Sequence, residues 1–246
     1  MRTAQYLMQH QSTLYTIISA TGQQVIFGIE KMLSVFAREK GAIMDPGLYP
    51  WTRDMERGYD AIRSELDRIL ADYEAIPNFD DLSAEQRRLV TGERRWKTHM
   101  LYAYGARFAG NIAQCPETDR MLQKIPGMVT AFFSIIEPHT GIAPHRGPYK
   151  GVLRYHLALR VPTPAESCGI RIGHEVYHWQ EGRSLIFDDT VTHEAWNNSD
   201  AIRVVLFVDF KRKFPMPVSL VNDLMIWMIK TSPFIAGIVD KVEQGK

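Results

Sequence analysis

Two patterns of hydrophobic and polar positions divide the chain. Residues 1–40 are predicted to be helical and amphipathic, with apolar residues at helical spacing over 25–36. A second apolar helix face runs from Met55 to Tyr73, and charged residues take the opposite face. From Met128 onward, short runs rich in β-branched and aromatic residues are separated by Gly, Pro and Asn. The patterns predict a helical first part followed by a β-rich core.

The β-rich core contains several strand-length runs with turn residues between them. The predicted strands cover residues 96–104, 129–136, 152–161, 168–172, 175–179, 184–187 and 202–210. Their spacing predicts an antiparallel sandwich or barrel with helices packed outside. We also expect a short helix over residues 116–124 with Thr118 as its cap, and an irregular loop over residues 76–95.

The C-terminal residues predict a second helical part. Residues 218–239 are strongly apolar and are interrupted near Pro233, and basic residues 211–213 and Lys230 flank them. Such a helix can dock on the core of the protein or form a dimer contact. Its basic flanks and Trp227 also suit a membrane surface, so both interpretations stay open.

The composition indicates a globular protein and agrees with this arrangement of elements. The 246 residues are 45% hydrophobic and 23% charged, which is typical of a globular domain. We predict a single domain over residues 1–246, with a helical part to about 95, a core of about 96–213 and a helical tail of about 214–246. The net charge of +1 gives no reason to expect a nucleic-acid partner.

The two cysteines and the lengths of the apolar runs bear on the cellular location of the protein. Cys115 and Cys168 lie far apart without CxxC spacing, so neither a zinc knuckle nor a disulfide framework is indicated. A reduced cytoplasmic location is therefore the default, peripheral to the membrane if the tail binds lipid. No run reaches the roughly 18 apolar residues that a spanning helix needs.

Three side chains in the β-rich core carry the candidate chemistry. His145 lies in PHRGPY, His193 lies in FDDTVTHE, and Arg203 follows ten residues later. Imidazole nitrogens bind first-row divalent metals well, and open coordination positions let oxygen and a chelating substrate bind. An arginine within a strand is costly to bury unless an anion pairs with it. The pattern indicates a ferrous ion beside a dicarboxylate co-substrate.

The segments that hold these residues resemble the aspartyl/asparaginyl β-hydroxylase family of ferrous, 2-oxoglutarate-dependent dioxygenases. The resemblance covers about a third of the chain and rests on EPHTGIAPHRGPYKGVLRYHLALRVP, CGIRIG and HWQEGRSLIFDDTVTHEAWNNSDAIRVVLFVDF. It implies a double-stranded β-helix (jelly-roll, cupin-like) fold, mainly β with flanking helices. It also implies hydroxylation of an unactivated C–H bond with Fe(II), O2 and 2-oxoglutarate, which becomes succinate.

The resemblance assigns roles by position. His145 and His193 would be the iron ligands, and with Arg203 they are the expected catalytic residues. Arg203, assisted by Ser134, would bind the distal carboxylate of 2-oxoglutarate, because arginine offers a fixed fork of donors. Arg154 and His156 would help to hold the end that chelates iron. Since neutral imidazole binds metal, activity should fall below a pH of about 6.

Position 147 departs from the common iron site of two histidines and one carboxylate. Gly147 cannot ligate through a side chain, and the resembled family also has glycine there, whereas the lipid A hydroxylases place aspartate. We expect a water in the vacant position, oriented by Asp188 or Asp189. That Asp188 instead caps its own loop is an equally open interpretation.

The family name points to the β-carbon of an aspartate or asparagine, in a small or peptidyl substrate. One alternative is an acyl-chain hydroxylase of the lipid A or ornithine-lipid type, which the apolar termini favour and Gly147 disfavours. A second is a non-catalytic module that binds 2-oxoglutarate or metal, suggested by the missing carboxylate. A weaker third is a structural interaction protein that uses the apolar tail. Residues outside the iron site decide the substrate.

Overall fold

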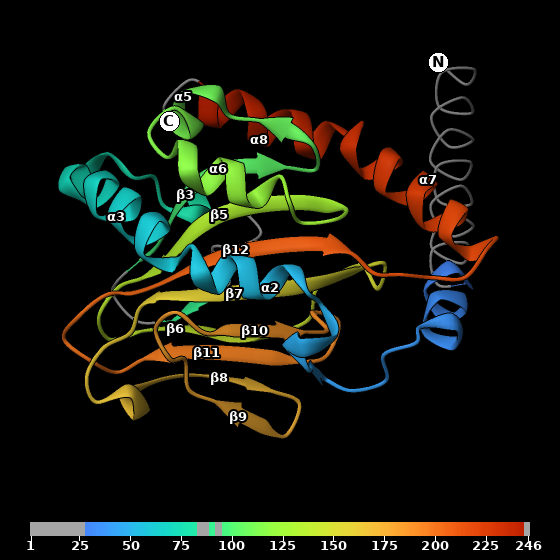
Figure 1. Ribbon diagram of the computed structural model, residues 1–246, viewed down its shortest axis with the longest axis horizontal. Coiled ribbons are helices and arrows are strands. Elements are labelled where there is room, and N and C mark those ends of the chain that lie inside the picture. The colour runs from blue at the N-terminus through green and yellow to red at the C-terminus, as the bar shows by residue number, and fades with distance from the viewer. Residues whose placement is uncertain (1–27, 83–88, 92–94, 244–246) are drawn as a thin grey trace, which may run out of the picture.

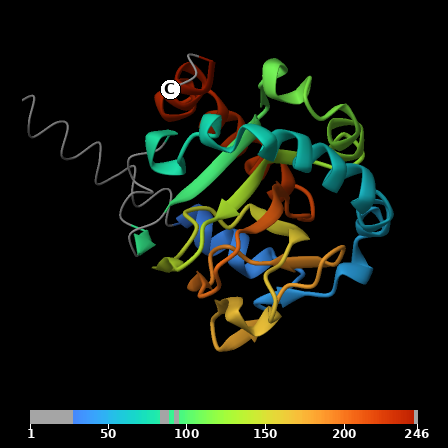
Figure 2. The same cartoon turned by 90° about the vertical axis from the view of Figure 1, so that its left-hand side faces the viewer.

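The computed structural model describes residues 28–82, 89–91 and 95–243. Two antiparallel sheets lie face to face, and helices cover the outer face of the larger sheet (Figure 1). In Figure 2 the cyan and green helices lie together on one side of the strands. The predicted fold class, mainly β with flanking helices in a jelly-roll, is confirmed.

The larger sheet has the strand order β1-β10-β7-β12-β5-β3-β4 in the described residues. Its strands are β1 (Ile43–Met44), β3 (Trp96–Ala103), β4 (Ala106–Arg107), β5 (Met128–Ile136), β7 (Val152–Arg160), β10 (Ser184–Phe187) and β12 (Arg203–Lys211). The smaller sheet has the order β2-β6-β11-β8-β9. Its strands are β2 (Val90–Thr91), β6 (Thr140–His145), β8 (Cys168–Ile172), β9 (Glu175–Tyr177) and β11 (His193–Asn197).

The central strand β12 shows why the core has two apolar layers. Val204, Leu206 and Val208 belong to the cluster that packs under the helices, whereas Val205 and Phe207 belong to the cluster between the sheets. Both faces of β12 are therefore buried, which explains its nearly continuous apolar sequence. The layer between the sheets also holds the candidate site.

Helices α2 (Trp51–Arg57) and α3 (Tyr59–Ile69) pack on the larger sheet through the apolar face that the sequence predicts, whereas η4 (Ala165–Ser167) lies beside β8 of the smaller sheet. The other helical bounds are η1 (Pro46–Leu48), η2 (Leu70–Ala75), α4 (Phe79–Leu82), α5 (Ala109–Ile112) and α6 (Pro116–Leu122). The predicted stretch from Met55 to Tyr73 is divided at Gly58, where a Cβ atom would lie 2.7 Å from Met121 Cε. Gly58 thus permits close packing of α6.

The predicted helix over residues 116–124 is confirmed as α6, but its predicted cap is wrong. The N-cap residue is Cys115, and Thr118 lies inside the helix. The Thr118 backbone N–H and hydroxyl both donate to Glu65 Oε2, each at 2.7 Å. A buried carboxylate from α3 therefore satisfies the first turn in place of a local cap. The predicted loop over 76–95 includes α4 and β2; residues 83–88 and 92–94 lie outside the described part.

The tail forms two helices, α7 (Val218–Lys230) and α8 (Pro233–Glu243), with the predicted break near Pro233. Val218 and Ile226 of α7 pack with Leu33, which lies in a helix over residues 28–36 beside α7 (Figure 1). Ile235 and Ile238 of α8 join the layer between the sheets. None of the described helices is long and apolar enough to cross a membrane. Residues 1–27 of the helical part predicted over residues 1–40 lie outside the described residues.

Candidate active site

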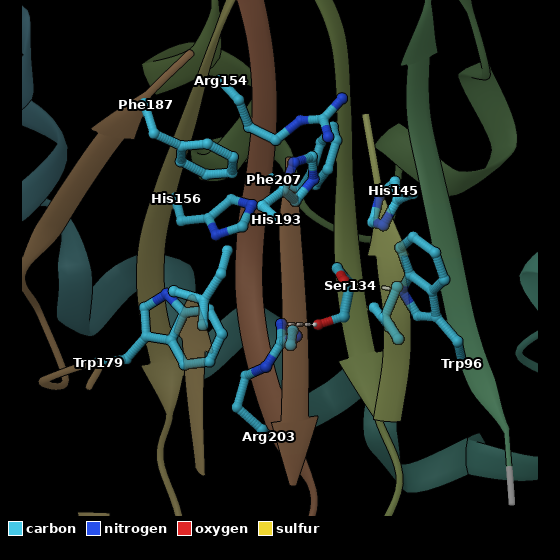
Figure 3. A pocket seen from close by; sticks show the side chains of 13 residues that line it. Trp96, Ser134, His145, Arg154, His156, Trp179, Phe187, His193, Arg203 and Phe207 are labelled. Carbon is cyan, nitrogen blue, oxygen red and sulfur yellow. Dashed lines mark hydrogen bonds between the residues drawn. The ribbon is translucent and has the colours of Figure 1, made fainter. Parts of the chain in front are cut away.

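Two histidines face each other across a pair of strands in the smaller sheet. His145 ends β6 and His193 begins β11, and the register pairs these two residues directly. Their ring centroids are 4.2 Å apart (Figure 3). Neither strand was predicted, because the β6 sequence TGIAPH contains Gly and Pro, and the β11 sequence HEAWN has little apolar character. Pairing in the sheet nevertheless brings the two imidazoles together.

The backbone fixes both imidazoles in the same way. His145 Nδ1 lies 2.9 Å from the carbonyl oxygen of Ala143, and His193 Nδ1 lies 2.9 Å from that of Val191. Because a carbonyl oxygen only accepts, each Nδ1 carries the proton and each Nε2 keeps a lone pair. This is the tautomer that a metal ligand needs.

Burial keeps both rings neutral. It lowers the pKa of His145, and together with the Arg154 charge and the His145 ring it lowers the pKa of His193 to about 3. The acid limit expected near pH 6 from unperturbed histidine is therefore too high for these two groups. Their neutral form persists at lower pH because protonation would place a charge on a largely buried ring.

The space left by Gly147 is filled by a carboxylate from another loop. A Cβ atom at position 147 would collide with the carboxylate of Asp189. Asp189 Oδ1 also lies 3.3 Å from His193 Nε2. The Asp189 carboxylate therefore lies where a side chain at 147 would be, beside the histidine pair. Of the two acids considered from the sequence, Asp189 is the one that faces the histidines.

Asp188 points away into a buried ionic cluster. Its carboxylate pairs with Arg212 at 2.6 Å and with Lys150, and it accepts from the Thr190 hydroxyl at 2.7 Å and the Thr190 N–H at 3.1 Å. Burial acts to raise its pKa, but Arg212, Lys150 and Thr190 together lower it. Asp188 thus holds the loop that carries Asp189, as the capping interpretation proposed.

Arg203 is a buried guanidinium at the opposite end of the cavity from the histidines (Figure 3). It lies over the Trp179 ring at 4.5 Å, and its Nη1 is 3.4 Å from the Ser134 carbonyl oxygen. Within the described residues no carboxylate pairs with it, and its Nε has no hydrogen-bond partner. Burial lowers its pKa to about 10. A carboxylate ligand would relieve this unpaired charge.

Ser134 and His156 lie beside Arg203 with polar atoms directed at the cavity. The Ser134 hydroxyl accepts a hydrogen bond from Trp96 Nε1 at 2.9 Å. His156 is buried, and neither of its ring nitrogens has a partner among the described residues. Burial, with the charges of Arg203 and Arg154, lowers its pKa well below the ordinary value. These groups are available to a polar ligand.

Arg154 is paired rather than open. It forms ion pairs with Asp189 and, at 2.9 Å, with Asp209, and it lies 4.1 Å from the Phe207 ring. Burial acts to lower its pKa, but the two carboxylates raise it overall. Burial in turn raises the pKa of Asp209. Arg154 therefore links the acid beside the histidines to a strand of the larger sheet.

All six residues predicted from the sequence line one small cavity of about 30 Å³, which opens in part to solvent. Sequence reasoning missed its apolar wall, whose members lie on strands of both sheets or on the loop after β9: Trp96, Ile142, Ile170, Trp179, Phe187, Ala195 and Phe207. Alternation within the predicted strands could have indicated most of this wall, but Ile142 and Ala195 lie on the unpredicted strands β6 and β11. In the part of the chain described, no group of three or more His, Cys, Asp or Glu side chains is arranged to hold a metal.

Comparison with known proteins identifies the family. The model of the aspartyl/asparaginyl β-hydroxylase family matches residues 56–213, which include both histidines and Arg203. The chain belongs to this family. The resemblance seen in the sequence is thereby confirmed, and the chain is a member of a hydroxylase family.

Individual members of this family differ in their named substrates. The chain is 45% identical over 193 residues to the ornithine lipid ester-linked acyl 2-hydroxylase of Rhizobium tropici, covering 78% of this chain and 68% of that protein. It is 31% identical over 175 residues to human aspartyl/asparaginyl β-hydroxylase, covering 65% of this chain and 22% of that protein. A Pseudomonas putida prolyl-4-hydroxylase structure matches with 15% identity and a TM-score of 0.40, over 63% of this chain and 88% of that chain.

Proposed function

We propose that the protein is an Fe(II)- and 2-oxoglutarate-dependent hydroxylase that acts on the acyl chain of a membrane lipid. One observation carries the proposal. Two imidazoles lie side by side at one end of a cavity whose other end holds a buried guanidinium without a carboxylate partner in the described residues. A metal ion would bind between the imidazoles, and a dicarboxylate would pair with the guanidinium.

The donor set fits these groups. His145 and His193 would hold the iron through Nε2, and the Asp189 carboxylate, which fills the space beside Gly147, would orient a water next to the iron. Arg203 and Ser134 would bind the distal carboxylate of 2-oxoglutarate, and His156 would contact its chelating end. Arg154, which already pairs with Asp189 and Asp209, would add positive charge near that end. When bound, iron and 2-oxoglutarate supply the oxidising power that an unactivated C–H bond requires.

The side chains around the cavity would position these groups and exclude water. Trp96 fixes the Ser134 hydroxyl, and Trp179 supports the Arg203 guanidinium from one side. The apolar wall excludes water from the reacting centre. The carbonyl oxygens of Ala143 and Val191 prevent either imidazole from turning its protonated nitrogen inward.

Similarity favours an acyl chain over an aspartyl residue as the substrate. The match to the acyl 2-hydroxylase is closer and covers more of both chains than the match to the human aspartyl/asparaginyl enzyme. This reverses the order of preference drawn from the motifs, in which the lipid substrate was the alternative. Hydroxylation of an aspartyl or asparaginyl β-carbon remains the second candidate because of that 31% identity.

The test supplies iron, ascorbate and 2-oxoglutarate with either a detergent-dispersed ornithine lipid or an aspartyl peptide. We expect succinate and a lipid heavier by one oxygen atom, both lost in His145→Ala and His193→Ala together with bound iron. His174→Ala, which removes an exposed histidine, should behave as wild type. A wild-type protein that binds iron and 2-oxoglutarate yet makes no succinate with either substrate would instead support the non-catalytic module.

A further inference from the structure

Helix α7 has two apolar faces, and only one is covered. Val218, Asn222 and Ile226 recur at four-residue steps and are buried against the body of the protein. On the outer face, large side chains are at least half exposed, with Trp227 at 59%: Leu220, Leu224, Trp227 and Met228. Met216, just before the helix, is 69% exposed. We call Met216 and these four residues the outer stripe.

Positive charge brackets the outer stripe. Lys213 precedes it and Lys230 ends the helix; both are exposed, and neither pairs with a carboxylate in the described part of the chain. The exposed acid on the helix, Asp223, is neutralised by Lys211 at 2.6 Å. An apolar stripe with a tryptophan and flanking lysines has the chemistry of a helix that lies in the headgroup layer of an anionic bilayer.

The charge distribution disfavours a second copy of the chain as the covering partner. A two-fold dimer that packs α7 against itself in antiparallel orientation would place each Lys213 end near the Lys230 end of the other copy. Like charges would then meet at both ends of the contact. Anionic lipid headgroups would instead pair with both lysines.

Helix α7 is also hydrogen-bonded to the loop that follows His145 of the candidate active site. Tyr149 donates to Asn222 Oδ1 at 2.6 Å, and Asn222 Nδ2 donates to the Gly151 carbonyl oxygen at 3.0 Å. Tyr149 and Gly151 belong to the loop that leads from His145 at the end of β6 to β7. The loop that leaves the histidine pair is thus held by the inner face of the helix whose outer face is apolar.

We propose that the outer stripe of α7 seats the protein on a membrane that contains anionic lipid, so that an acyl chain reaches the histidine pair from the bilayer. The lipid route rests on the proposed function, whereas the membrane contact rests on α7 itself. The helix over residues 28–36, which packs beside α7, adds exposed Val35 and Phe36 to this end of the molecule (Figure 1).

The first experiment measures binding to vesicles without turnover. Full-length protein is sedimented with vesicles of equal parts phosphatidylglycerol and phosphatidylcholine, and with phosphatidylcholine alone. We expect binding to the anionic vesicles, at least tenfold weaker in Leu224→Asp/Trp227→Asp. Lys213→Glu/Lys230→Glu should lose only the preference for anionic lipid. Val176→Asp is the matched control, because Val176 is a 54% exposed apolar residue on β9.

Thermal unfolding of each variant shows that the fold is kept, which is expected because the substituted side chains are exposed. Wild-type protein that stays in the supernatant with anionic vesicles overturns the membrane contact. So does a wild-type dimer that Leu224→Asp/Trp227→Asp converts to a monomer without any vesicle binding, since the stripe would then be a contact between copies.

A second experiment separates this inference from the proposed function. Leu224→Asp/Trp227→Asp should hydroxylate detergent-dispersed lipid at the wild-type rate and lose activity only on vesicles. Wild-type protein that binds vesicles but hydroxylates no lipid supports the membrane contact and overturns the lipid substrate. Wild-type protein that hydroxylates dispersed lipid but binds no vesicle overturns the membrane contact and leaves the proposed function standing.

Discussion

At the scale of single residues, the missing side chain of Gly147 and the carboxylate of Asp189 form one feature. A glycine is required at 147 because the Asp189 carboxylate fills the space beside it. Asp189 is in turn held by Arg154 and lies near His193. The carboxylate beside the histidine pair thus comes from a different loop and not from the residue two after the first histidine.

Gly147→Ala should therefore damage the site although it adds a single methyl group. The new methyl displaces the Asp189 carboxylate, so we expect iron affinity to fall by about 10–100-fold, the usual effect of disturbing a group that orients metal ligands. Iron binding is measured by titration under anaerobic conditions. Gly110→Ala is the control, because no atom lies within 4 Å of a Cβ at position 110.

A double variant makes this prediction specific. Gly147→Asp/Asp189→Gly moves the carboxylate to the position common in ferrous sites and removes the collision. The double variant should bind iron more tightly than Gly147→Asp alone or Asp189→Gly alone. Equal losses of iron affinity in Gly147→Ala and Gly110→Ala would contradict this explanation. So would a double variant that binds iron more weakly than both Gly147→Asp and Asp189→Gly.

At the scale of elements, neighbouring strands β7 and β12 carry two buried arginines with opposite energetic roles. Arg154 on β7 has two carboxylate partners, whereas Arg203 on β12 has none among the described residues. An unpaired buried charge destabilises a fold, whereas removing one member of a buried pair leaves the other member uncompensated.

Arg203→Met should accordingly stabilise the ligand-free protein, by about 1–4 kcal/mol, while Arg154→Met should destabilise it by about 3–5 kcal/mol. Urea unfolding of both variants measures these changes in the free energy of unfolding. Added 2-oxoglutarate should raise the melting temperature of wild-type protein but not of Arg203→Met, because binding to the folded state alone stabilises it. A destabilised Arg203→Met would mean that its charge is already compensated.

The same elements indicate how much of the fold could be predicted from sequence. Strands such as β7, β8, β10 and β12 follow their apolar runs to within a residue or so, because burial on a regular pleat requires that pattern. Strands β6 and β11, which carry the histidines, have no such pattern and form by pairing with each other and, for β11, with the predicted strand β8. The motifs located the histidines in the sequence. Only the folded structure shows that Asp189, and not Asp188, lies beside them.

At the scale of the whole molecule, buried histidines that stay neutral make stability depend on pH. His99 on β3 is 6% exposed and lies outside the candidate active site, and burial lowers its pKa to about 4, against a weaker opposing effect of a backbone hydrogen bond with Asn111. His193 and His156 are also buried with lowered pKa values. The unfolded chain therefore binds more protons than the folded protein over the mildly acidic range.

The sign follows from where the two pKa values of His99 lie. Its folded value of about 4 is below the unfolded value of about 6.5, so its full contribution to stability is present above pH 6.5 and is lost as the pH falls toward 4. Between pH 7 and pH 5 the loss from this one group is about 2 kcal/mol. His99→Gln should therefore lose about 2 kcal/mol less than wild type over that interval. Urea unfolding of the metal-free protein at both pH values measures the difference, and the residual loss in His99→Gln reports the other buried histidines. Identical losses in the two proteins would show that His99 is already charged, or already solvated, in the folded state.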